Sequence, residues 1–590
     1  MANRNVFTSY KRLEEALESI LADESNDEEY DMVLVPPDPA VVSDEEEGNE
    51  DNLAASSFPK DVPGTIEVGR RRPDYDVSEW SDSDDEPLRP IPAKHVKKCD
   101  VDLPVWRKTQ PTYSSTYEIT DIVQKRQKYV VESLADCNPL TLFEKIFDHD
   151  VMDLITTNSV LYANQNNRHG FELDSASLKK FFGVLILTGY HELPSERAYW
   201  SLDEDLGVPL IANCMSRNRF LEIKRNLHFV DNGLIDGSTD KMIKLRSLCD
   251  LIQRNSSQWG VFHESLSVDE SMIKYFGRHP SKQFIQGKPV RFGYRNWAAT
   301  SSDGYCYAFD VYCGKSTEPS DDTLGARVVK SLLAKMPLVP KEHIVYFDNF
   351  FTNHQLLLDL GRLGFRGTGT VRENRTKKCP LITVKNMKKK PRAEYDYSFD
   401  TKNEITMVRW KDNNVVTMGT NFDDIEPLGK VKRWCNIRKQ KVDVNIPKMF
   451  VNYNKGMGGV DQMDQSISLY RISIKGKKWW WVIFTYLLDM AISNAWRLHV
   501  LLSKTKQEIT YMDQLSFRRT IARTYLRPTK TKSRPSSSAA LGGRNNNGHN
   551  PERMENPLRC VICHQRIRWR CEICLKTLCV ERPCFKQFHS

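Results

Sequence analysis

The stretch that decides the fold is residues 266–275, Leu-Ser-Val-Asp-Glu-Ser-Met-Ile-Lys-Tyr. Apolar and polar side chains alternate along it, and this period of two predicts a β-strand with one buried face. Asp269 lies within this strand. A carboxylate among apolar neighbours loses its hydration, so it needs a pairing partner or a metal ion. We therefore expect Asp269 to serve chemistry at the sheet.

The sequence that follows predicts a mixed α/β fold. Asp303-Gly304 is a hairpin signal between two alternating stretches. The predicted order is strand 291–300, strand 305–312, helix 326–334, strand 344–347, helix 355–363 and strand 365–371. Asp348 directly follows the fourth strand, in Tyr-Phe-Asp-Asn-Phe. A second carboxylate is thus expected at the end of a strand of the same sheet.

Two further carboxylates, Asp461 and Asp464, are three residues apart in a predicted helix and share one of its faces. Gly456, Gly458 and Gly459 just upstream suit a tight turn into that helix. Taken singly, an aspartate is more often a cap, a turn or a salt-bridge residue. The order first strand, fourth strand, later helix is that of the carboxylates in an RNase H-like nuclease core. Such carboxylates suit Mg²⁺ or Mn²⁺, which take hard oxygen ligands.

The charge of the chain is divided unevenly. Residues 1–97 contain 25 acidic and 10 basic residues, whereas the remainder holds 75 basic and 52 acidic ones. A basic body with an acidic tail indicates a polyanionic partner for which the tail could compete, although a merely solubilising tail gives the same pattern. No apolar run reaches the roughly 18 residues of a membrane span, so no membrane partner is expected.

Cysteines cluster at the carboxyl end of the chain. Six of 14 lie in the last 31 residues. Their CxxC spacing predicts structural Zn²⁺ rather than disulfides. The potential ligands are Cys560, Cys563, Cys571, Cys574, Cys579, Cys584 and His589. The two CxxC pairs could share one ion and the remaining ligands a second, with His564 as the fourth ligand; a cross-braced set would combine them differently, so the spacing leaves the pairing open.

Several short motifs, in this order, resemble the piggyBac family of transposases over roughly residues 118–590. They are Ser267-Val268-Asp269-Glu270-Ser271 with Gly277-Arg278, Phe347-Asp348-Asn349-Phe350-Phe351-Thr352, Gly369-Thr370-Val371-Arg372, Tyr453-Asn454 through Asp461, and Asp464-Gln465. The resemblance implies that Asp269, Asp348 and Asp461 are a catalytic triad of metal ligands and that Asp464 is a further acidic position. It also implies cleavage at transposon ends, hairpin intermediates and insertion at TTAA.

The resemblance also implies positions that contact DNA. Arg372 and Arg375 match basic positions near DNA, and arginine can bind phosphate with two hydrogen bonds. Trp479 matches a tryptophan near the catalytic pocket, where it could stack on a displaced base. The run Lys388, Lys389 and Lys390 could follow the DNA backbone or act as a nuclear import signal. Arg566, Arg568 and Arg570, among the cysteines, suit contact between the zinc domain and transposon-end DNA, although a protein-binding finger is an alternative.

These observations predict an α/β protein with an RNase H-like catalytic core, a flanking helical DNA-binding and dimerisation domain, a β-rich insertion and a C-terminal zinc domain. The expected boundaries are an acidic disordered tail at 1–97, a linker at 98–117, helical domain at 118–264 and 471–535, core at 265–374 and 448–470, insertion at 375–447, linker at 536–555 and zinc domain at 556–590. We expect a nuclear, homodimeric DNA transposase. The alternative is a domesticated DNA-binding protein of the nucleus that no longer moves DNA.

Overall fold

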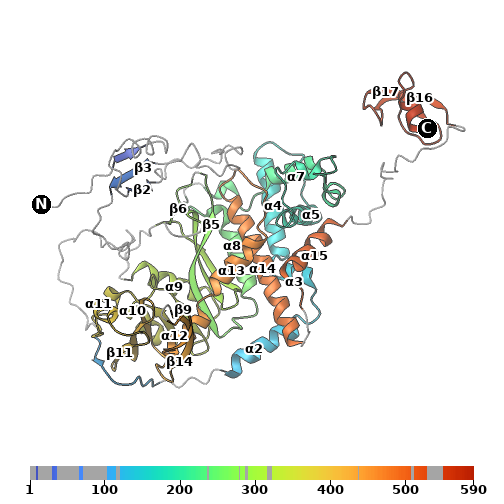
Figure 1. Ribbon diagram of the computed structural model, residues 1–590. Helices are drawn as coiled ribbons and strands as arrows, with labels where there is room; N and C mark the ends of the chain where they lie inside the picture. Colours follow the sequence, from blue (N-terminus) through green and yellow to red (C-terminus); the bar gives the residue numbers. More distant parts are fainter. Residues whose placement is uncertain are drawn as a thin grey trace. The chain divides into compact units, whose positions relative to one another are not determined.

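The computed structural model describes residues 8–10, 30–35, 65–70, 103–114, 120–235, 238, 240–277, 279–285, 290–314, 322–435, 438–506, 511–527 and 549–589. The chain divides into two compact units, Met1–Arg527 and Pro528–Ser590. Figure 1 shows the elements of both. No helix in the described part of the chain combines the length and the apolar character needed to cross a bilayer.

The core of the first unit is a sheet in which β8 (Cys306–Val311), β7 (Phe292–Ser301), β5 (Ser265–Lys274), β9 (Ile344–Phe347) and β10 (Arg366–Thr370) lie side by side in that order. The first three strands are antiparallel, and β9 and β10 run parallel to β5. The expected hairpin between β7 and β8 is present, with Gly304 at φ +92° and the Tyr305 amide donating to the Ser301 Oγ at 2.9 Å. The expected mixed α/β fold, with the strand order of an RNase H-like core, is therefore confirmed.

Helices supply the connections between the parallel strands. α9 (Leu324–Ala334) joins β8 to β9, and α10 (His354–Arg362) joins β9 to β10. Thr323 and Asn353 cap their first turns by accepting hydrogen bonds from backbone amides. Both helices bury an apolar face, and β9 pairs in parallel with the first half of β5, so that β9 ends opposite the middle of β5.

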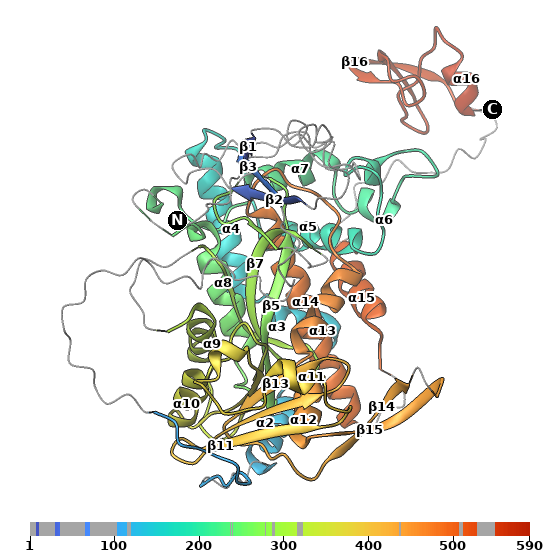
Figure 2. The same ribbon diagram turned by 60° about the vertical axis from the view of Figure 1, so that its left-hand side comes forward.

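The residues expected to form an inserted segment continue the same sheet. β13 (Val415–Thr420) pairs with β10, and β12 (Ile405–Lys411), β11 (Tyr395–Asp400) and β4 (Trp106–Arg107) follow, while β6 (Gln283–Phe284) pairs with β7. The result is one sheet of ten strands. Among the described residues of 375–447, β14 (Gly429–Cys435) and β15 (Gln440–Ile446) leave this sheet and form a two-stranded ribbon (Figure 2).

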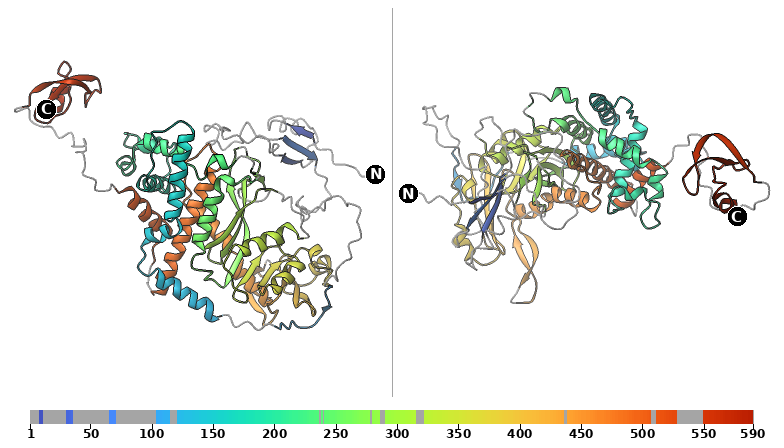
Figure 3. Two further views of the ribbon diagram at one scale, coloured as in Figure 1. Left: turned by 180° about the vertical axis from the view of Figure 1, so that it is seen from behind. Right: turned by 90° about the horizontal axis from the view of Figure 1, so that it is seen from above.

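A helical layer packs on the sheet. Its members are α2 (Thr120–Ser133), α3 (Pro139–Ile146), α4 (His149–Gln165), α5 (Ser175–Thr188), α6 (Pro209–Ala212), α7 (Arg217–Asn226), α8 (Ile243–Ser256), α12 (Lys448–Gly456), α13 (Gly459–Leu469), α14 (Trp481–Thr505) and α15 (Gln514–Leu526). α14 is buried on nearly every face along most of its length. Figure 3 shows α14 running through the helical layer from two further directions.

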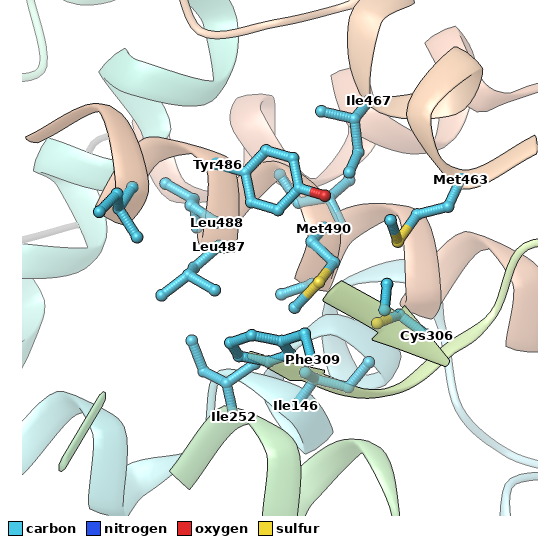
Figure 4. Packing of buried hydrophobic residues seen from close by; sticks show 14 of the residues in the cluster. Ile146, Ile252, Cys306, Phe309, Met463, Ile467, Tyr486, Leu487, Leu488 and Met490 are labelled. Carbon is cyan, nitrogen blue, oxygen red and sulfur yellow. The ribbon is translucent and has the colours of Figure 1, made fainter. Parts of the chain in front are cut away.

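One apolar core joins the helices to the sheet. Figure 4 shows Ile146 of α3, Ile252 of α8, Phe309 of β8, Met463 of α13 and Met490 of α14 in a single cluster. Within this core α14 also carries Asp489, which forms a fully buried ion pair with Arg518 of α15. Because removing either partner would leave an unpaired buried charge, this pair fixes how the two helices dock.

The N-terminal stretch contains three short strands, β1 (Thr8–Tyr10), β2 (Tyr30–Val35) and β3 (Thr65–Arg70), which form a sheet in the order β1-β3-β2. We expected no regular structure in residues 1–97, so that expectation does not hold for these strands. The other residues of the predicted acidic tail lie outside the described part of the chain, as do Arg278 and most of the predicted linker 536–555.

The second unit contains β16 (Pro551–Arg559), β17 (Arg566–Cys571) and α16 (Cys584–His589). β16 and β17 form an antiparallel hairpin. Its small apolar cluster consists mainly of cysteines with Leu578, Ile562 and Phe585. A core of this size is too small to hold the unit together unaided.

Candidate functional site

Asp269 and Asp348 emerge from neighbouring strands at one edge of the sheet. β5 and β9 are parallel, and Val268 lies opposite Phe347 in their register. Asp269 directly follows Val268, and Asp348 directly follows Phe347, so the two aspartates are neighbours across this strand pair. Asp269 Oδ1 accepts a hydrogen bond from the Glu270 amide at 2.8 Å, and Asp348 Oδ1 accepts one from the Phe350 amide at 2.9 Å. Both side chains are half-buried, so they are held by the fold yet open to solvent.

Helix α13 brings Asp461 to the same face of β5. Residues 267, 269 and 271 share one face of that strand because strand side chains alternate. The Ser267 hydroxyl donates to the Met457 carbonyl just before α13, and the Ser271 hydroxyl donates to Asp464 at 2.6 Å. α13 therefore spans the face that carries Asp269. Asp461 lies between these two contacts and is exposed.

The close approach of α13 depends on glycine. A Cβ at Gly459 would lie 2.1 Å from the Ser301 carbonyl oxygen and 2.5 Å from the Thr300 Oγ1. Neither distance is possible for a real side chain, so the first turn of α13 rests directly on the end of β7. The helix begins with the Gly-Gly pair that the sequence marked as a tight turn.

Asp464 is oriented by a buried network. Its partner Ser271 is buried, and the Ser271 Oγ also lies 3.0 Å from the Tyr486 hydroxyl of α14. Burial and the nearby Asp464 charge raise the pKa of Tyr486 well above its ordinary value, so this phenol stays protonated at neutral pH. Asp464 thus ties α13 to β5 and α14 and holds the turn of α13 that carries Asp461.

Tyr453 of α12 is a site residue that the motif contained but to which we assigned no role. Burial raises its pKa, a hydrogen bond with Thr370 opposes that rise, and the charges of Asp348 and Asp269 raise it further. Its ring also packs edge-on against Tyr346, with ring centroids 6.2 Å apart. A neutral phenol therefore lies in the combined field of both carboxylates. Sequence periodicity gives no signal for this placement, because α12 and the two strands are far apart in the chain.

The donor chemistry of this edge fits a divalent cation. Two half-buried carboxylates, one within β5 and one directly after β9, and an exposed one on α13 offer hard oxygen ligands from three elements. Mg²⁺ keeps several waters, so a few carboxylates from different elements suffice to hold it. Burial is the main reason that the pKa of Tyr453 is raised, and the charges of Asp348 and Asp269 add to that rise.

Basic residues flank this edge. Arg372 donates from Nε to the Asn349 Oδ1 at 3.4 Å, and Arg375 donates to the Asn349 carbonyl at 3.2 Å. The structure therefore brings both arginines to the loop that directly follows Asp348. The run Lys388–Lys390 ends the short helix α11 (Val384–Lys388), where all three lysines are exposed and Met387 anchors the turn in the core.

Trp479 is placed differently from what base stacking requires. It is only 8% exposed, and its ring stacks on His279 with centroids 4.2 Å apart. A base could stack on that face only if His279 moved away. The neighbouring Trp480 and Trp481 pack in the core, at 1% and 2% exposed.

The C-terminal unit gathers its potential ligands into two sets of four. Cys560, Cys563, Cys579 and Cys584 form one set, and His549, Cys571, Cys574 and His589 form the other; within each set the ligand atoms lie within 4.8 Å of one another. The two CxxC pairs fall into different sets, so the structure groups the potential ligands in an interleaved way, as a cross-braced arrangement would.

The second set differs from the prediction in its fourth member. His549 joins it, with Nδ1 3.2 Å from the Cys571 Sγ, and His564 belongs to neither set. His549 precedes the first cysteine by eleven residues in a polar stretch, where spacing alone gives no signal. His589 directs Nε2 toward the Cys574 Sγ at 3.2 Å while its Nδ1 lies 2.8 Å from the Phe585 carbonyl. That second contact orients the ring as metal-binding histidines are usually oriented.

The chemistry of both sets fits Zn²⁺, which favours four soft ligands in a tetrahedron. A hydrogen bond from the Gln565 amide lowers the pKa of Cys563 to about 6. Burial, and then the neighbouring Cys563 and Cys560, raise the pKa of Cys579 to about 12. Four thiolates so close together repel one another, and a divalent cation relieves that repulsion.

The arginines of β17 have distinct surroundings. Arg570 pairs with Glu552 across the hairpin at 2.8 Å, so its charge is partly neutralised. Arg566 and Arg568 are exposed. Arg566 lies directly opposite Arg559 of β16, which is also exposed. Like charges opposite each other destabilise a hairpin, so this pair is a natural place for an anion. Arg559 lay outside our predicted set.

Comparison with known proteins finds relatives over nearly the whole length of the chain. A family model described as "Transposase IS4" matches residues 138–496. Two human proteins, PiggyBac transposable element-derived protein 3 and protein 2, are each 33% identical to this chain over 95% of its length. The matched region spans 96% of the length of protein 3 and 93% of the length of protein 2. A third human relative, PiggyBac transposable element-derived protein 5, is 22% identical over 56% of this chain.

A solved structure has the same fold. It is the cryo-EM structure of a piggyBac transposase synaptic complex with hairpin DNA, with a TM-score of 0.57 and 20% identity, covering 74% of this chain and 96% of that one. The extent of the family match and the near full-length relatives decide the assignment: the chain belongs to the piggyBac family of transposases.

Proposed function

We propose that this protein cuts and rejoins DNA by metal-dependent phosphoryl transfer, with Asp269, Asp348 and Asp461 as the ligands of Mg²⁺ or Mn²⁺. The observation that carries the proposal is the pairing of Val268 with Phe347, which sets two carboxylates side by side at one sheet edge. α13 then adds the third from the same face of β5. When bound, the cations polarise the phosphodiester and activate the attacking oxygen.

The chain's own residues account for the surroundings of that reaction. Asp464 holds α13 through Ser271, so it positions Asp461. Tyr453 presents a neutral hydroxyl beside Asp348 and Asp269. Arg372 and Arg375 stand at the loop after Asp348, where a scissile phosphate would have to lie. Arginine suits that place because its planar fork binds phosphate oxygens in pairs.

The C-terminal unit is proposed to bind two Zn²⁺ ions and to hold transposon-end DNA. The support is the pair of four-ligand sets together with the exposed Arg566, Arg568 and Arg559 on one hairpin. Two opposed arginines favour a phosphate between them. A protein partner for this unit is the alternative, and DNA titration of the zinc-loaded full chain distinguishes the two.

The finer steps rest on the family resemblance. We propose that cleavage passes through hairpin intermediates, that insertion occurs at TTAA, that the active species is a homodimer and that the protein works in the nucleus. The structural relative is named as a synaptic complex with hairpin DNA, which supports the hairpin step and DNA as the partner. The exposed lysines 388–390 support nuclear import.

A second function remains open for a member of this family. The human relatives are named as transposable element-derived proteins, which favours a domesticated DNA-binding role. Intact aspartates at all four positions favour an enzyme. Terminal inverted repeats beside the gene would favour mobility, and their absence would favour domestication.

Two measurements test the proposal. The first is binding of Mn²⁺, followed by electron paramagnetic resonance, in the full chain and in Asp269→Ala and Asp348→Ala variants. We expect both variants to lose Mn²⁺ affinity, and unchanged affinity in both would overturn the assignment of the metal site. The second is excision of a plasmid-borne element carrying the DNA that flanks the gene, which separates a mobile transposase from a domesticated one.

A further inference from the structure

The ribbon of β14 and β15 has no role in the site described above. Figure 2 and the right-hand view of Figure 3 show it as a hairpin that projects from the body of the first unit. Its strands pair in regular register from Gly429 opposite Ile446 to Cys435 opposite Gln440. Because two-stranded ribbons are marginally stable alone, something must hold this one in place.

The inner face of the ribbon supplies that support. Val431, Val444 and Ile446 pack with Val408 and Trp410 of β12 in a separate apolar cluster. Further along the same face, Arg433 donates from Nε to Asp412 Oδ2 at 2.8 Å. The inner face is therefore fully explained by docking onto the extended sheet.

Packing on the sheet does not account for the residues of the outer face. Along β14, Lys430, Lys432 and Trp434 point outward and are exposed, and the indole is 54% exposed. Across the ribbon, Lys441 lies opposite Trp434, and Asp443 lies opposite Lys432. This face thus carries three lysines, a single carboxylate and a large aromatic ring. The turn adds the exposed Arg438 and Lys439.

Such a face matches nucleic acid in both charge and shape. Lysines neutralise backbone phosphates and release bound counterions. The major groove of B-DNA admits a two-stranded β-ribbon. An exposed tryptophan gains nothing from water but can pack on a sugar or a base. We propose that the outer face of the β14–β15 ribbon is a contact surface for double-stranded DNA, with Lys430, Lys432 and Lys441 on phosphates and Trp434 between them.

The connection to the rest of the chain suits this role. β15 ends at Ile446 and leads through Pro447 directly into α12, which carries Tyr453 beside Asp269 and Asp348. DNA held on the ribbon is therefore bound by the same continuous segment that helps to build the candidate active site. This inference rests on the proposed function, because it requires that the protein bind DNA.

The test measures DNA affinity of the full chain against salt concentration. The probe is a fluorescein-labelled duplex of mixed sequence, followed by fluorescence anisotropy. Each lost phosphate contact lowers the steepness of log K against log salt by about 0.9. The variant with Lys430, Lys432 and Lys441 all changed to Gln should lower it by roughly 2.7. The matched variant with the same three lysines changed to Arg should bind like the wild type, because it keeps the charge.

Two more variants separate recognition from structure. Asp443→Asn removes the acidic group of this face and should strengthen binding at low salt, which a structural role would not produce. Trp434→Ala should weaken duplex binding by roughly fivefold, the equivalent of about 1 kcal/mol of lost apolar contact, without changing the salt dependence.

The outcomes are distinguishable from failure of the proposed function. If the wild type does not bind duplex DNA at low salt, both proposals fall. If the wild type binds, and the folded Lys→Gln variant keeps the wild-type salt dependence, then only the ribbon proposal is wrong. Circular dichroism and the thermal midpoint establish that each variant is folded.

Discussion

At the scale of single residues, the site depends on carboxylates that β5, the end of β9 and α13 supply from separate parts of the chain. We expect Asp269→Ala, Asp348→Ala and Asp461→Ala each to reduce DNA cleavage by at least roughly a thousandfold, because a divalent cation contributes several kcal/mol to the transition state. DNA affinity should change little, since it comes mostly from phosphate contacts. Cleavage and gel-shift assays on the same preparations measure both.

Glu270→Gln is the matched control for these variants. Glu270 is adjacent to Asp269 but points to the other face of β5, where it lies 3.5 Å from the Arg295 Nε. Its substitution should leave cleavage within a few-fold of wild type. Wild-type cleavage by any one of the three alanine variants would remove that aspartate from the metal site.

The buried histidines make stability depend on pH. Burial, with the nearby Lys241 and Lys244, lowers the pKa of His279 to about 3. The unfolded chain titrates this group near pH 6.5, so below that pH only the unfolded state holds the proton. Stability is therefore complete above about pH 6.5 and falls as the pH drops toward 3, by up to about 1.4 kcal/mol per pH unit.

His279→Phe tests this, because phenylalanine keeps the stacking on Trp479 and cannot titrate. The variant should lose less stability than the wild type between pH 6.5 and 5, as measured by urea unfolding of the full chain. His228 and His343, whose pKa values burial lowers to about 4, contribute further dependence of the same sign. Identical pH profiles of variant and wild type would contradict the assignment to His279.

At the scale of elements, adjacent glycines at the start of α13 give a sharp comparison. A Cβ at Gly459 would collide with the Ser301 carbonyl at 2.1 Å, whereas one at Gly458 meets nothing within 4 Å. Gly459→Ala should displace α13 and Asp461 with it, and we expect cleavage to fall at least roughly tenfold, since misplacement of about 1 Å can cost a hundredfold. Gly458→Ala should cleave like the wild type. Equal rates for the two variants would show that α13 is not held against β7.

Local patterns predicted local elements well. The alternation in 266–275 and the Asp-Gly turn gave β5, β7 and β8 almost to their ends, because a half-buried strand and a tight turn leave their mark within a few residues. Strand-end carboxylates were found for the same reason. The pairing of β13 with β10 was not predicted, since register between strands 50 residues apart has no local signal. Tyr453 and the buried state of Trp479 depend on equally distant contacts.

The C-terminal unit shows the same limit of sequence-based prediction over a shorter span of the chain. CxxC spacing identified six cysteines and His589 but not which of them meet, because the pairing is decided by how the hairpin folds back. His549→Asn should reduce the zinc content of the chain from about two ions to about one, since it removes a ligand from the second set. His564→Asn is the control and should keep both, because His564 belongs to neither set. Zinc is counted by mass spectrometry after dialysis.

At the scale of the whole molecule, residues 1–97 and the remainder of the chain carry net charges of opposite sign. Deleting residues 1–97 removes a net charge of −15 from a body of +23. We expect the shortened protein to bind DNA more tightly at low salt, because the acidic residues no longer compete with phosphates. The gain should shrink as salt rises, since screening weakens both interactions. Equal affinities at low salt, measured with one duplex, would contradict this competition.

The continuous ten-stranded sheet also constrains how this family can change. β10 lies between β9, which leads to Asp348, and β13, which belongs to residues 375–447. A descendant that lost those residues would expose the edge of β10 with its backbone groups unpaired, and open edges promote aggregation. The segment that the sequence predicts as an insertion is therefore part of the main sheet and cannot be deleted without exposing β10. Natural variation in this stretch should be confined to its turns and to the projecting ribbon, while β11, β12 and β13 should be inherited together with β5, β9 and β10.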